Sequence, residues 1–340
     1  MSTVAIVGAT GAVGEEFLRV LEERRFPVSR LIPLASAKSV GKSVAFRGES
    51  VPVKDLARFD FRGVDVAFFS AGADRSREHA PRAAAAGALV VDNSSAYRLD
   101  PDVPLVVPEV NLDAAKSHKG IVSNPNCSTI LLVLVLAPIQ RHVAIRRVIV
   151  STYQAVSGSG ARGLAELSRQ IDEDKAGAPP TLEVYPDPIA SNVIPFVQAF
   201  GDAGLTTEEW KMIKETRRIL DLPTLPVTAT CVRVPVRRAH SEAVNVELAR
   251  AATPDEVRGW LRTAPGVRVT DDPARLEFPT PRDAEGKDDV LVGRIRRDPS
   301  RETAIDLFLS GDQLRKGAAL NAVQIAEALA VSAPAGASRT

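Results

Sequence analysis

Cys127 lies where the segment Ser123–Thr129 meets an apolar stretch that runs from Ile130 to Gln140. The apolar stretch predicts a helix that begins beside the cysteine. The positive end of a helix dipole favours the thiolate, which is the nucleophilic form of the side chain. By residue type alone, a lone cysteine is more often a small buried hydrophobe. The interpretation of Cys127 therefore depends on the residues that the fold brings to it.

Two further residues suit chemistry at a thiolate. Gln154 ends a predicted strand that breaks into a glycine-rich loop, where an amide could face a developing oxyanion. His240 lies between two β-rich runs, and histidine titrates near neutrality, so it could move protons. The alternatives are a solvated loop glutamine and a surface histidine. Together with Cys127 they would suit covalent acyl transfer.

A glycine-rich turn follows the first predicted strand and opens the first predicted helix, in the sequence Gly8-Ala9-Thr10-Gly11-Ala12-Val13-Gly14. In this context backbone N–H groups at the helix N-terminus can hold a pyrophosphate. The spacing is GxxGxxG rather than GxGxxG, and the alternative is a tight turn that needs glycine for backbone reasons. The sequence thus predicts a dinucleotide site.

The end of the second predicted strand indicates which dinucleotide. Enzymes that prefer NAD place an acidic residue there for the ribose 2′-hydroxyl, and this chain has none. Ser36, Lys38 and Ser39 stand there instead, and their donors suit the 2′-phosphate of NADP. A solvated loop lysine is the alternative.

Alternating apolar runs and helical stretches make up the first part of the chain. Helices are predicted at Val13–Glu23 and at 74–86. Strands are predicted at Val4–Ala9, Leu31–Ala35, Val64–Ser70, Ala88–Asp92, Leu105–Val107 and Ile121–Ser123. This alternation predicts an α/β fold of Rossmann type, with a doubly wound parallel sheet.

The second part is rich in breakers and then in β-formers, as in Thr228–Val236 and Ala243–Leu248. It predicts an α+β domain with a mainly antiparallel sheet. A terminal helix from Asp312 is expected to return to the first domain. The expected domains are residues 1–126 with 312–332, then 127–311, with a disordered tail at 333–340.

The composition of the chain indicates which classes of binding partner are to be expected. A chain of 340 residues with 45% hydrophobic content fits two domains, and a net charge of +1 with 5% aromatics disfavours nucleic-acid binding. The longest apolar run, Ile130–Ile139, contains Pro138 and is too short to span a membrane. The start lacks a basic region, which favours the cytoplasm over secretion. The two cysteines are expected as thiols, and no metal-ligand spacing occurs.

These motifs, taken in order, resemble the aspartate-β-semialdehyde dehydrogenase family over nearly the whole chain. The resemblance rests on the following blocks: Gly8–Gly14, Ser94–Arg98, Asn124–Thr129, Tyr153–Gly158, Glu208–Lys211, Arg233–Val236, His240–Ser241 and Asn321–Gln324.

The resemblance implies NADPH-dependent conversion of β-aspartyl phosphate to aspartate β-semialdehyde, on the route to lysine, threonine and methionine. It makes Cys127 the nucleophile, His240 the acid/base and Gln154 the residue that orients the acyl intermediate. The implied substrate residues are Arg233 for the carboxylate, Glu208 for the ammonium group, Arg98 with Lys211 for the phosphate, and Asn126. The implied NADP residues are Gly8, Thr10, Gly11, Ala12, Val13, Ser36, Lys38, Ser39, Ser157, Gly158 and Gln324.

The sequence is compatible with two other functions. N-acetyl-γ-glutamyl-phosphate reductase resembles this family, but an acid such as Glu208 has no purpose if the substrate nitrogen is acetylated. Without the resemblance, Glu208 and Lys211 would be interpreted as an exposed i, i+3 helix pair. A non-catalytic NADP-binding sensor is the other alternative. Association is expected as a homodimer or homotetramer.

Overall fold

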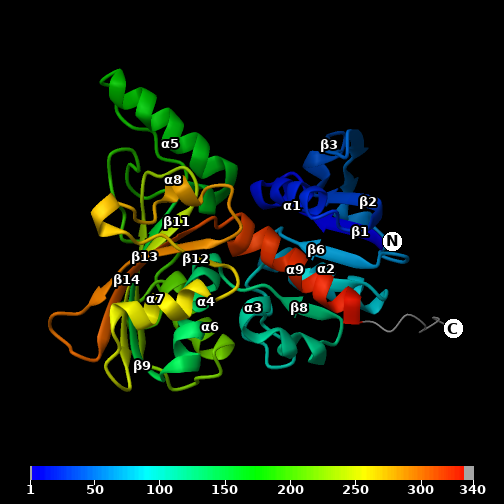
Figure 1. The fold of residues 1–340 in the computed structure, drawn as a ribbon. Coiled ribbons are helices and arrows are strands. Elements are labelled where there is room, and N and C mark those ends of the chain that lie inside the picture. Colours follow the sequence, from blue (N-terminus) through cyan, green and yellow to red (C-terminus); the bar gives the residue numbers. More distant parts are fainter. Residues whose placement is uncertain (1, 333–340) are drawn as a thin grey trace. The chain divides into compact units, whose positions relative to one another are not determined.

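The structure is a computed structural model that describes residues 2–332. The tail expected at 333–340 lies outside the described residues. By its internal contacts the chain divides into two units, one of Met1–Asn126 with the chain from Ala318 on, and one of Cys127–Gly317 (Figure 1). Among the described residues, no helix is both long and apolar enough to cross a membrane.

The first unit is built on a six-stranded sheet in which every neighbouring pair is parallel, in the order β5-β2-β1-β6-β7-β8. Its strands are β1 (Ser2–Val7), β2 (Val28–Ala35), β5 (Lys54–Asp55), β6 (Val66–Phe69), β7 (Leu89–Asp92) and β8 (Ile121–Ser123). Strands that are covered on both faces are apolar, as Val4–Val7 of β1 are.

Helices cover both faces of this sheet. Val4 and Ile6 of β1 pack in one core with α1 (Ala12–Glu23) and α9 (Leu320–Ser332). Ala5 and Val7 pack in a second core with α2 (Ala73–Ala85). The doubly wound arrangement predicted from the sequence is confirmed. A short helix α3 (Pro108–Asn111) and a hairpin of β3 (Ser43–Phe46) and β4 (Glu49–Pro52) complete the unit.

The strand predicted at Leu105–Val107 does not form. This segment makes only an isolated parallel bridge between Leu105 and Ser123. The Asn111 side chain takes two of its other backbone groups: it donates to the Leu105 carbonyl and accepts from the Val107 N–H, both at 2.9 Å. Because these groups are already bonded, they cannot extend a ladder.

The second unit contains a mixed six-stranded sheet in the order β10-β9-β11-β14-β13-β12. Its strands are β9 (Ile145–Gln154), β10 (Val227–Arg233), β11 (His240–Leu248), β12 (Val267–Val269), β13 (Val290–Arg297) and β14 (Ala304–Gly311). The central pairs are antiparallel, as predicted, whereas the pair at each edge is parallel.

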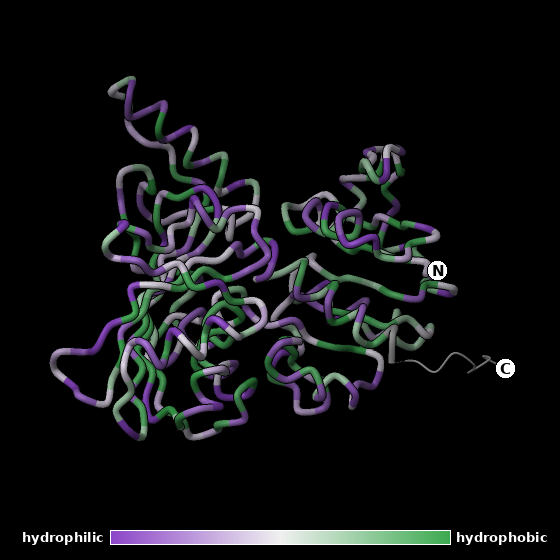
Figure 2. The backbone as a smooth tube through the Cα atoms, viewed as in Figure 1, coloured by the Kyte–Doolittle hydropathy of each residue, from purple (hydrophilic) through white to green (hydrophobic). Residues whose placement is uncertain are grey.

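Helices α4 (Cys127–His142), α6 (Thr207–Ile219) and α7 (Pro254–Arg262) pack together beside this sheet, and α8 (Pro281–Ala284) is a short turn. Helix α5 (Gly160–Lys175) alternates hydrophilic and hydrophobic residues along its length (Figure 2). Its Leu167 packs against Tyr185 and Ile189 in a small separate core.

The chain returns to the first unit later than the sequence suggested. Residues 312–317 belong to the second unit, and α9 begins at Leu320 after a π-turn at Arg315–Ala319. The reason is local bonding: Asp312 is fully buried and forms a 2.7 Å ion pair with Arg238 of the second unit.

Candidate active site

Three of the expected site residues meet at one end of the second sheet. Gln154 ends β9, Arg233 ends β10 opposite it, and His240 begins β11. The backbone of Ala155 joins them: its N–H donates to His240 Nδ1 at 3.0 Å, and its carbonyl accepts from Arg233 Nη1 at 2.6 Å. Residues far apart in the sequence are thereby held at one place.

Cys127 is the first residue of α4 and is partly exposed. The next residue, Ser128, accepts a hydrogen bond from Gln154 Nε2 at 3.2 Å, which places the start of α4 beside the end of β9. The approach is close at Gly317 too, where an added Cβ would lie 3.0 Å from the Cβ of Cys127. The structure thus places Gln154 in contact with the residue that follows Cys127.

His240 is fully buried beside the Arg233 guanidinium. Burial, and secondly the charge of Arg233, holds the pKa of His240 well below its ordinary value. Because Nδ1 accepts from the Ala155 N–H, the ring proton must be on Nε2. Nε2 has no hydrogen-bond partner within residues 2–332. The neutral ring therefore presents an N–H donor.

Glu208 is buried, with only 2% of its surface exposed, so it is not part of an exposed helix pair. A capping box between Thr206 and Glu209 starts α6 and places Glu208 in the first turn. One carboxylate oxygen accepts from Gln154 Nε2 and the other from Lys211 Nζ, both at 3.2 Å. Glu208 and Lys211 thus join the cluster around Gln154.

Arg98 and Asn126 belong to the first unit, and both are buried. Arg98 donates to the Asn124 carbonyl at 3.0 Å and to the Asn93 carbonyl at 2.6 Å, so it braces the loops that follow β7 and β8. Asn126 immediately precedes Cys127 in the chain.

The glycine-rich turn of the first unit is as tight as its sequence suggests. A Cβ at Gly8 would lie 2.5 Å from the Ser70 carbonyl oxygen, and one at Gly14 would lie 2.3 Å from the Gly8 carbonyl oxygen. Gly11 precedes α1, whose first turn includes Ala12 and Val13. Backbone sterics alone account for Gly8 and Gly14, and the same turn leaves the N-terminus of α1 accessible to an anion.

The residues that the sequence predicts for a 2′-phosphate lie next to this turn. Thr10 Oγ1 is 3.5 Å from Ser39 Oγ, which joins the glycine-rich turn to the short helix Ala37–Ser39. Lys38 lies exposed in that helix, and Ser36 precedes it. A cavity of about 500 Å³ opens beside Thr10 and extends to Lys42.

The remaining expected cofactor residues lie in both units. Ser157 and Gly158 form the turn after β9 in the second unit. A Cβ at Gly158 would lie 2.8 Å from Arg233 Nη1 and 3.2 Å from His240 Cε1, so this turn directly adjoins the site. Gln324 lies on α9 in the first unit and donates to Glu109 at 3.1 Å.

Sequence reasoning missed Glu242, which lies two residues after His240 on the same face of β11. It is fully buried, and neither carboxyl oxygen has a hydrogen-bond partner among the described residues. Burial, and secondly the charge of Glu208, raises the pKa of Glu242 well above its ordinary value. An acid at i+2 from a site histidine on a strand was the available signal.

No group of three or more His, Cys, Asp or Glu residues in the described chain is arranged to hold a metal ion. Cys231 is a buried thiol on β10, two residues before Arg233, and burial strongly raises its pKa. The two cysteines thus differ in environment: Cys127 is partly exposed at a helix start, and Cys231 is enclosed within the sheet.

Family models match both units. Residues 3–118 match the NAD binding domain of semialdehyde dehydrogenases, and residues 136–316 match their dimerisation domain. An aspartate-semialdehyde dehydrogenase of Legionella pneumophila is 51% identical over 96% of this chain and 95% of its own length.

Two solved structures are also similar to this chain. The aspartate semialdehyde dehydrogenase II of Vibrio cholerae complexed with ASA has a TM-score of 0.95 and 46% identity, covering 98% of this chain and 99% of the other. The Candida albicans enzyme with NADP has a TM-score of 0.75 and 25% identity, covering 97% and 98%.

Proposed function

We propose, from the premise that this chain belongs to the aspartate-semialdehyde dehydrogenase family, that it converts β-aspartyl phosphate to aspartate β-semialdehyde with NADPH. This reaction would serve lysine, threonine and methionine biosynthesis in the cytoplasm. The observation that carries the proposal is the joining of His240 and Arg233 through Ala155, beside Gln154 and the start of α4.

Cys127 is the proposed nucleophile. Its thiolate attacks the acyl carbon, and the carbonyl electrons move to oxygen in a tetrahedral intermediate. The intermediate then expels phosphate and leaves a thioester on Cys127. The Nε2–H of His240 is the donor that stabilises the oxyanion, and Gln154 orients the acyl group.

The resemblance implies that His240 both donates and accepts protons. In this structure its Nε2–H can donate a hydrogen bond, but Nδ1 is already occupied by the Ala155 N–H. Protonation of Nδ1 would set two donors against each other at Ala155, so the imidazolium is disfavoured. Full proton transfer through this ring therefore requires the Ala155 contact to open.

NADP is the proposed cofactor, and when bound as NADPH it would supply the hydride that reduces the thioester carbon. Breaking of the C–S bond would then release the aldehyde and return the Cys127 thiolate. Gly8, Gly11 and the N-terminus of α1 would hold its pyrophosphate, because the backbone N–H groups at the start of a helix attract an anion. Lys38 and Ser39 would donate to its 2′-phosphate. The match to an NAD binding domain and the similarity to the Candida albicans enzyme with NADP support this choice. The other proposed NADP contacts are Thr10, Ala12, Val13, Ser36, Ser157, Gly158 and Gln324.

The substrate is the proposed reason for a buried acid beside Gln154. Glu208 would bind the free ammonium group, and Arg233 would bind the carboxylate through its planar fork. Lys211, Arg98 and Asn126 are the proposed contacts of the phosphate end. This division favours an aspartyl substrate over an N-acetylated one, whose nitrogen carries no charge.

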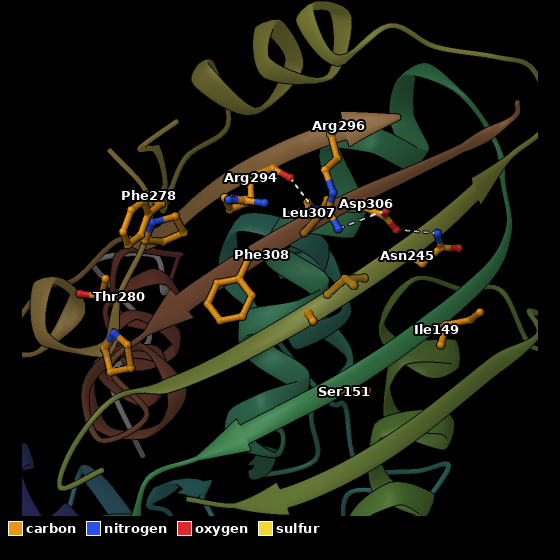
Figure 3. A pocket seen from close by; sticks show the side chains of 14 residues that line it. Ile149, Ser151, Asn245, Phe278, Thr280, Arg294, Arg296, Asp306, Leu307 and Phe308 are labelled. Carbon is orange, nitrogen blue, oxygen red and sulfur yellow. Dashed lines mark hydrogen bonds and ion pairs between the residues drawn. The ribbon is translucent and has the colours of Figure 1, made fainter. Parts of the chain in front are cut away.

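A homodimer is the proposed assembly, formed through the open face of the second sheet. Ile149, Phe278 and Phe308 line an apolar cavity of about 660 Å³ on this face (Figure 3). Arg296 and Asp306, which also line the cavity, form a 3.2 Å ion pair with each other, so their charges are already paired within one chain. The match to a dimerisation domain supports a second copy as the occupant. Sedimentation of a Phe308→Asp variant as a monomer, with the wild type as a dimer, would agree with this.

The activity is tested in reverse. Aspartate β-semialdehyde, phosphate and NADP should give NADPH absorbance, and N-acetylglutamate semialdehyde should give none. The Cys127→Ser variant should lose turnover by several orders of magnitude, because its hydroxyl is a weaker nucleophile at neutral pH. Wild-type turnover by that variant would exclude the thioester. NADP binding without turnover of either aldehyde would point to a sensor instead.

A further inference from the structure

Gln313 is a buried amide that joins two parts of the site and that the proposed mechanism does not use. It follows β14 and is only 2% exposed. Its Oε1 accepts from the Ala239 N–H at 2.8 Å, and its Nε2 donates to Ser157 Oγ at 2.5 Å. One side chain thus joins the residue before His240 to the turn after β9, and all of these residues lie in the second unit.

The direction of this hydrogen-bond chain is determined by Ala239. A backbone N–H only donates, so the Gln313 atom that faces it must be the carbonyl oxygen. The NH₂ group therefore faces Ser157, whose hydroxyl oxygen must accept. The Ser157 hydroxyl hydrogen cannot point back at this donor, so it is available to another acceptor.

The two segments that Gln313 joins are each held in position. The Val156 N–H bonds to the Val236 carbonyl at 2.8 Å, so the turn lies along the segment that leads to His240. Ala239 has φ 68°, a left-handed conformation that is uncommon for a residue with a Cβ, and its bond to Gln313 supports it. A substitution of Gln313 would therefore alter the positions of both Ser157 and His240.

We propose that Gln313 is a positioning residue that presents the Ser157 hydroxyl as a hydrogen-bond donor to an acceptor oxygen of the nicotinamide cofactor. This inference rests on the proposed function, which places NADP at Ser157. The acceptor is a phosphate oxygen or the carboxamide oxygen of the nicotinamide, since both accept the same O–H donor.

The Gln313→Glu substitution reverses the chain at nearly constant shape. A carboxylate accepts from both Ala239 and Ser157, so it captures the hydroxyl hydrogen that the cofactor needs. NADPH binding, followed by cofactor fluorescence, should weaken about tenfold in this variant and in Ser157→Ala, the effect of one hydrogen bond to a polar ligand. The double variant should bind no more weakly than Gln313→Glu alone.

Comparison of the two single variants with the double variant separates capture of the Ser157 hydroxyl from simple charge repulsion by the new carboxylate. If repulsion were the cause, the two substitutions would weaken binding multiplicatively, and that result would overturn the proposal. Binding by Gln313→Glu within twofold of wild type would also overturn it. Failure of the wild type to bind NADPH would instead refute the proposed cofactor, so the two failures are distinguishable.

Gln170→Glu is the matched control for a new buried carboxylate. Gln170 lies on α5 and is 1% exposed; its Oε1 accepts from the Ile189 N–H at 2.8 Å and its Nε2 donates to the buried Glu166 at 3.1 Å. Its variant should leave the NADPH affinity unchanged. If it weakened binding as much as Gln313→Glu, the effect would be general and the proposal would fail.

Two further arms complete the test. If Gln313→Glu does not fold, Gln313→Met removes both bonds at similar volume, and Ser157→Ala should then cost less than threefold on that background. Equal costs on both backgrounds would overturn the proposal. Titration with 2′-phospho-ADP-ribose, which lacks nicotinamide, locates the acceptor: a persisting effect assigns a phosphate oxygen, and loss of the effect assigns the carboxamide.

Discussion

The Nδ1 atom of His240 accepts a hydrogen bond from the backbone N–H of Ala155 at 3.0 Å. This bond, burial and the neighbouring Arg233 charge act in the same direction, because each favours the neutral ring. The histidine is thus favoured as a neutral ring that donates through Nε2.

The pH profile of the reaction is the first prediction. Because the pKa of His240 lies well below 6.5, lowering the pH from 7.5 to 6.0 should not protonate it. His240→Asn should lower kcat about 100-fold, the cost of one oxyanion donor, and keep the wild-type shape of kcat/KM against pH. A limb near pH 6.5 that is present in the wild type and absent in the variant would contradict this.

Glu242 gives a prediction about stability. Its folded pKa is raised, so the folded state binds the proton more tightly than the unfolded chain does. Its contribution is fully present below pH 4.5 and is lost as the pH rises toward the folded pKa. In that window the wild type should lose about 1.4 kcal/mol of unfolding free energy per pH unit through this group, and Glu242→Gln should not.

The measurement is the midpoint of thermal unfolding for both proteins between pH 5 and 8. Glu208 and Cys231 are the titratable groups that interact electrostatically with Glu242. Neither is substituted in either protein, so their contributions are common to both measurements. Glu247→Gln is the control, since Glu247 lies on the same strand but bonds Arg301 at 3.0 Å. A difference between wild type and Glu242→Gln that is constant with pH would show that Glu242 is not protonated in the fold.

The two cysteines should differ in reactivity. Cys127 is partly exposed at the start of α4, whereas burial raises the pKa of the Cys231 thiol. Iodoacetamide at pH 8 should therefore modify Cys127 at least tenfold faster than Cys231, as measured by peptide mass spectrometry. NADPH-linked activity should be lost in parallel with modification of Cys127. Faster modification of Cys231, or loss of activity that follows it, would contradict the assignment of the nucleophile.

Much of the fold was predictable because its signals are local. The apolar run of β1 and the turn at Gly8 predict a parallel sheet and a first helix, and both form. The strand expected at Leu105–Val107 failed because the Asn111 side chain takes its backbone groups. That competition depends on a side-chain conformation, and periodicity does not contain it.

The site was only partly predictable from the residues themselves. Cys127, Gln154 and His240 stand at element ends, which sequence can locate. Glu208 resembled an exposed helix residue, because its burial depends on packing against Gln154 from a distant strand. Gln313 gave no sequence signal, since its function depends on hydrogen bonds across 156 residues to Ser157 and 74 residues to Ala239.

Gly158 provides the last prediction, because it is small for a reason unrelated to backbone conformation. A Cβ there would lie 2.8 Å from Arg233 Nη1, so Gly158→Ala should push the guanidinium away from the Ala155 carbonyl. We expect KM for aspartate β-semialdehyde to rise about tenfold and the unfolding free energy to fall by about 1–3 kcal/mol, the usual cost of overpacking. Steady-state kinetics and thermal unfolding measure the two effects.

Gly259 on α7 is the matched control for that substitution. A Cβ at this position has no neighbour within 4 Å, and alanine is the better helix former by about 1 kcal/mol. Gly259→Ala should therefore raise the melting temperature slightly and leave KM unchanged. If Gly158→Ala lowered stability but left KM at the wild-type value, the carboxylate would not be bound by Arg233, and that contact would have to be sought elsewhere in the site.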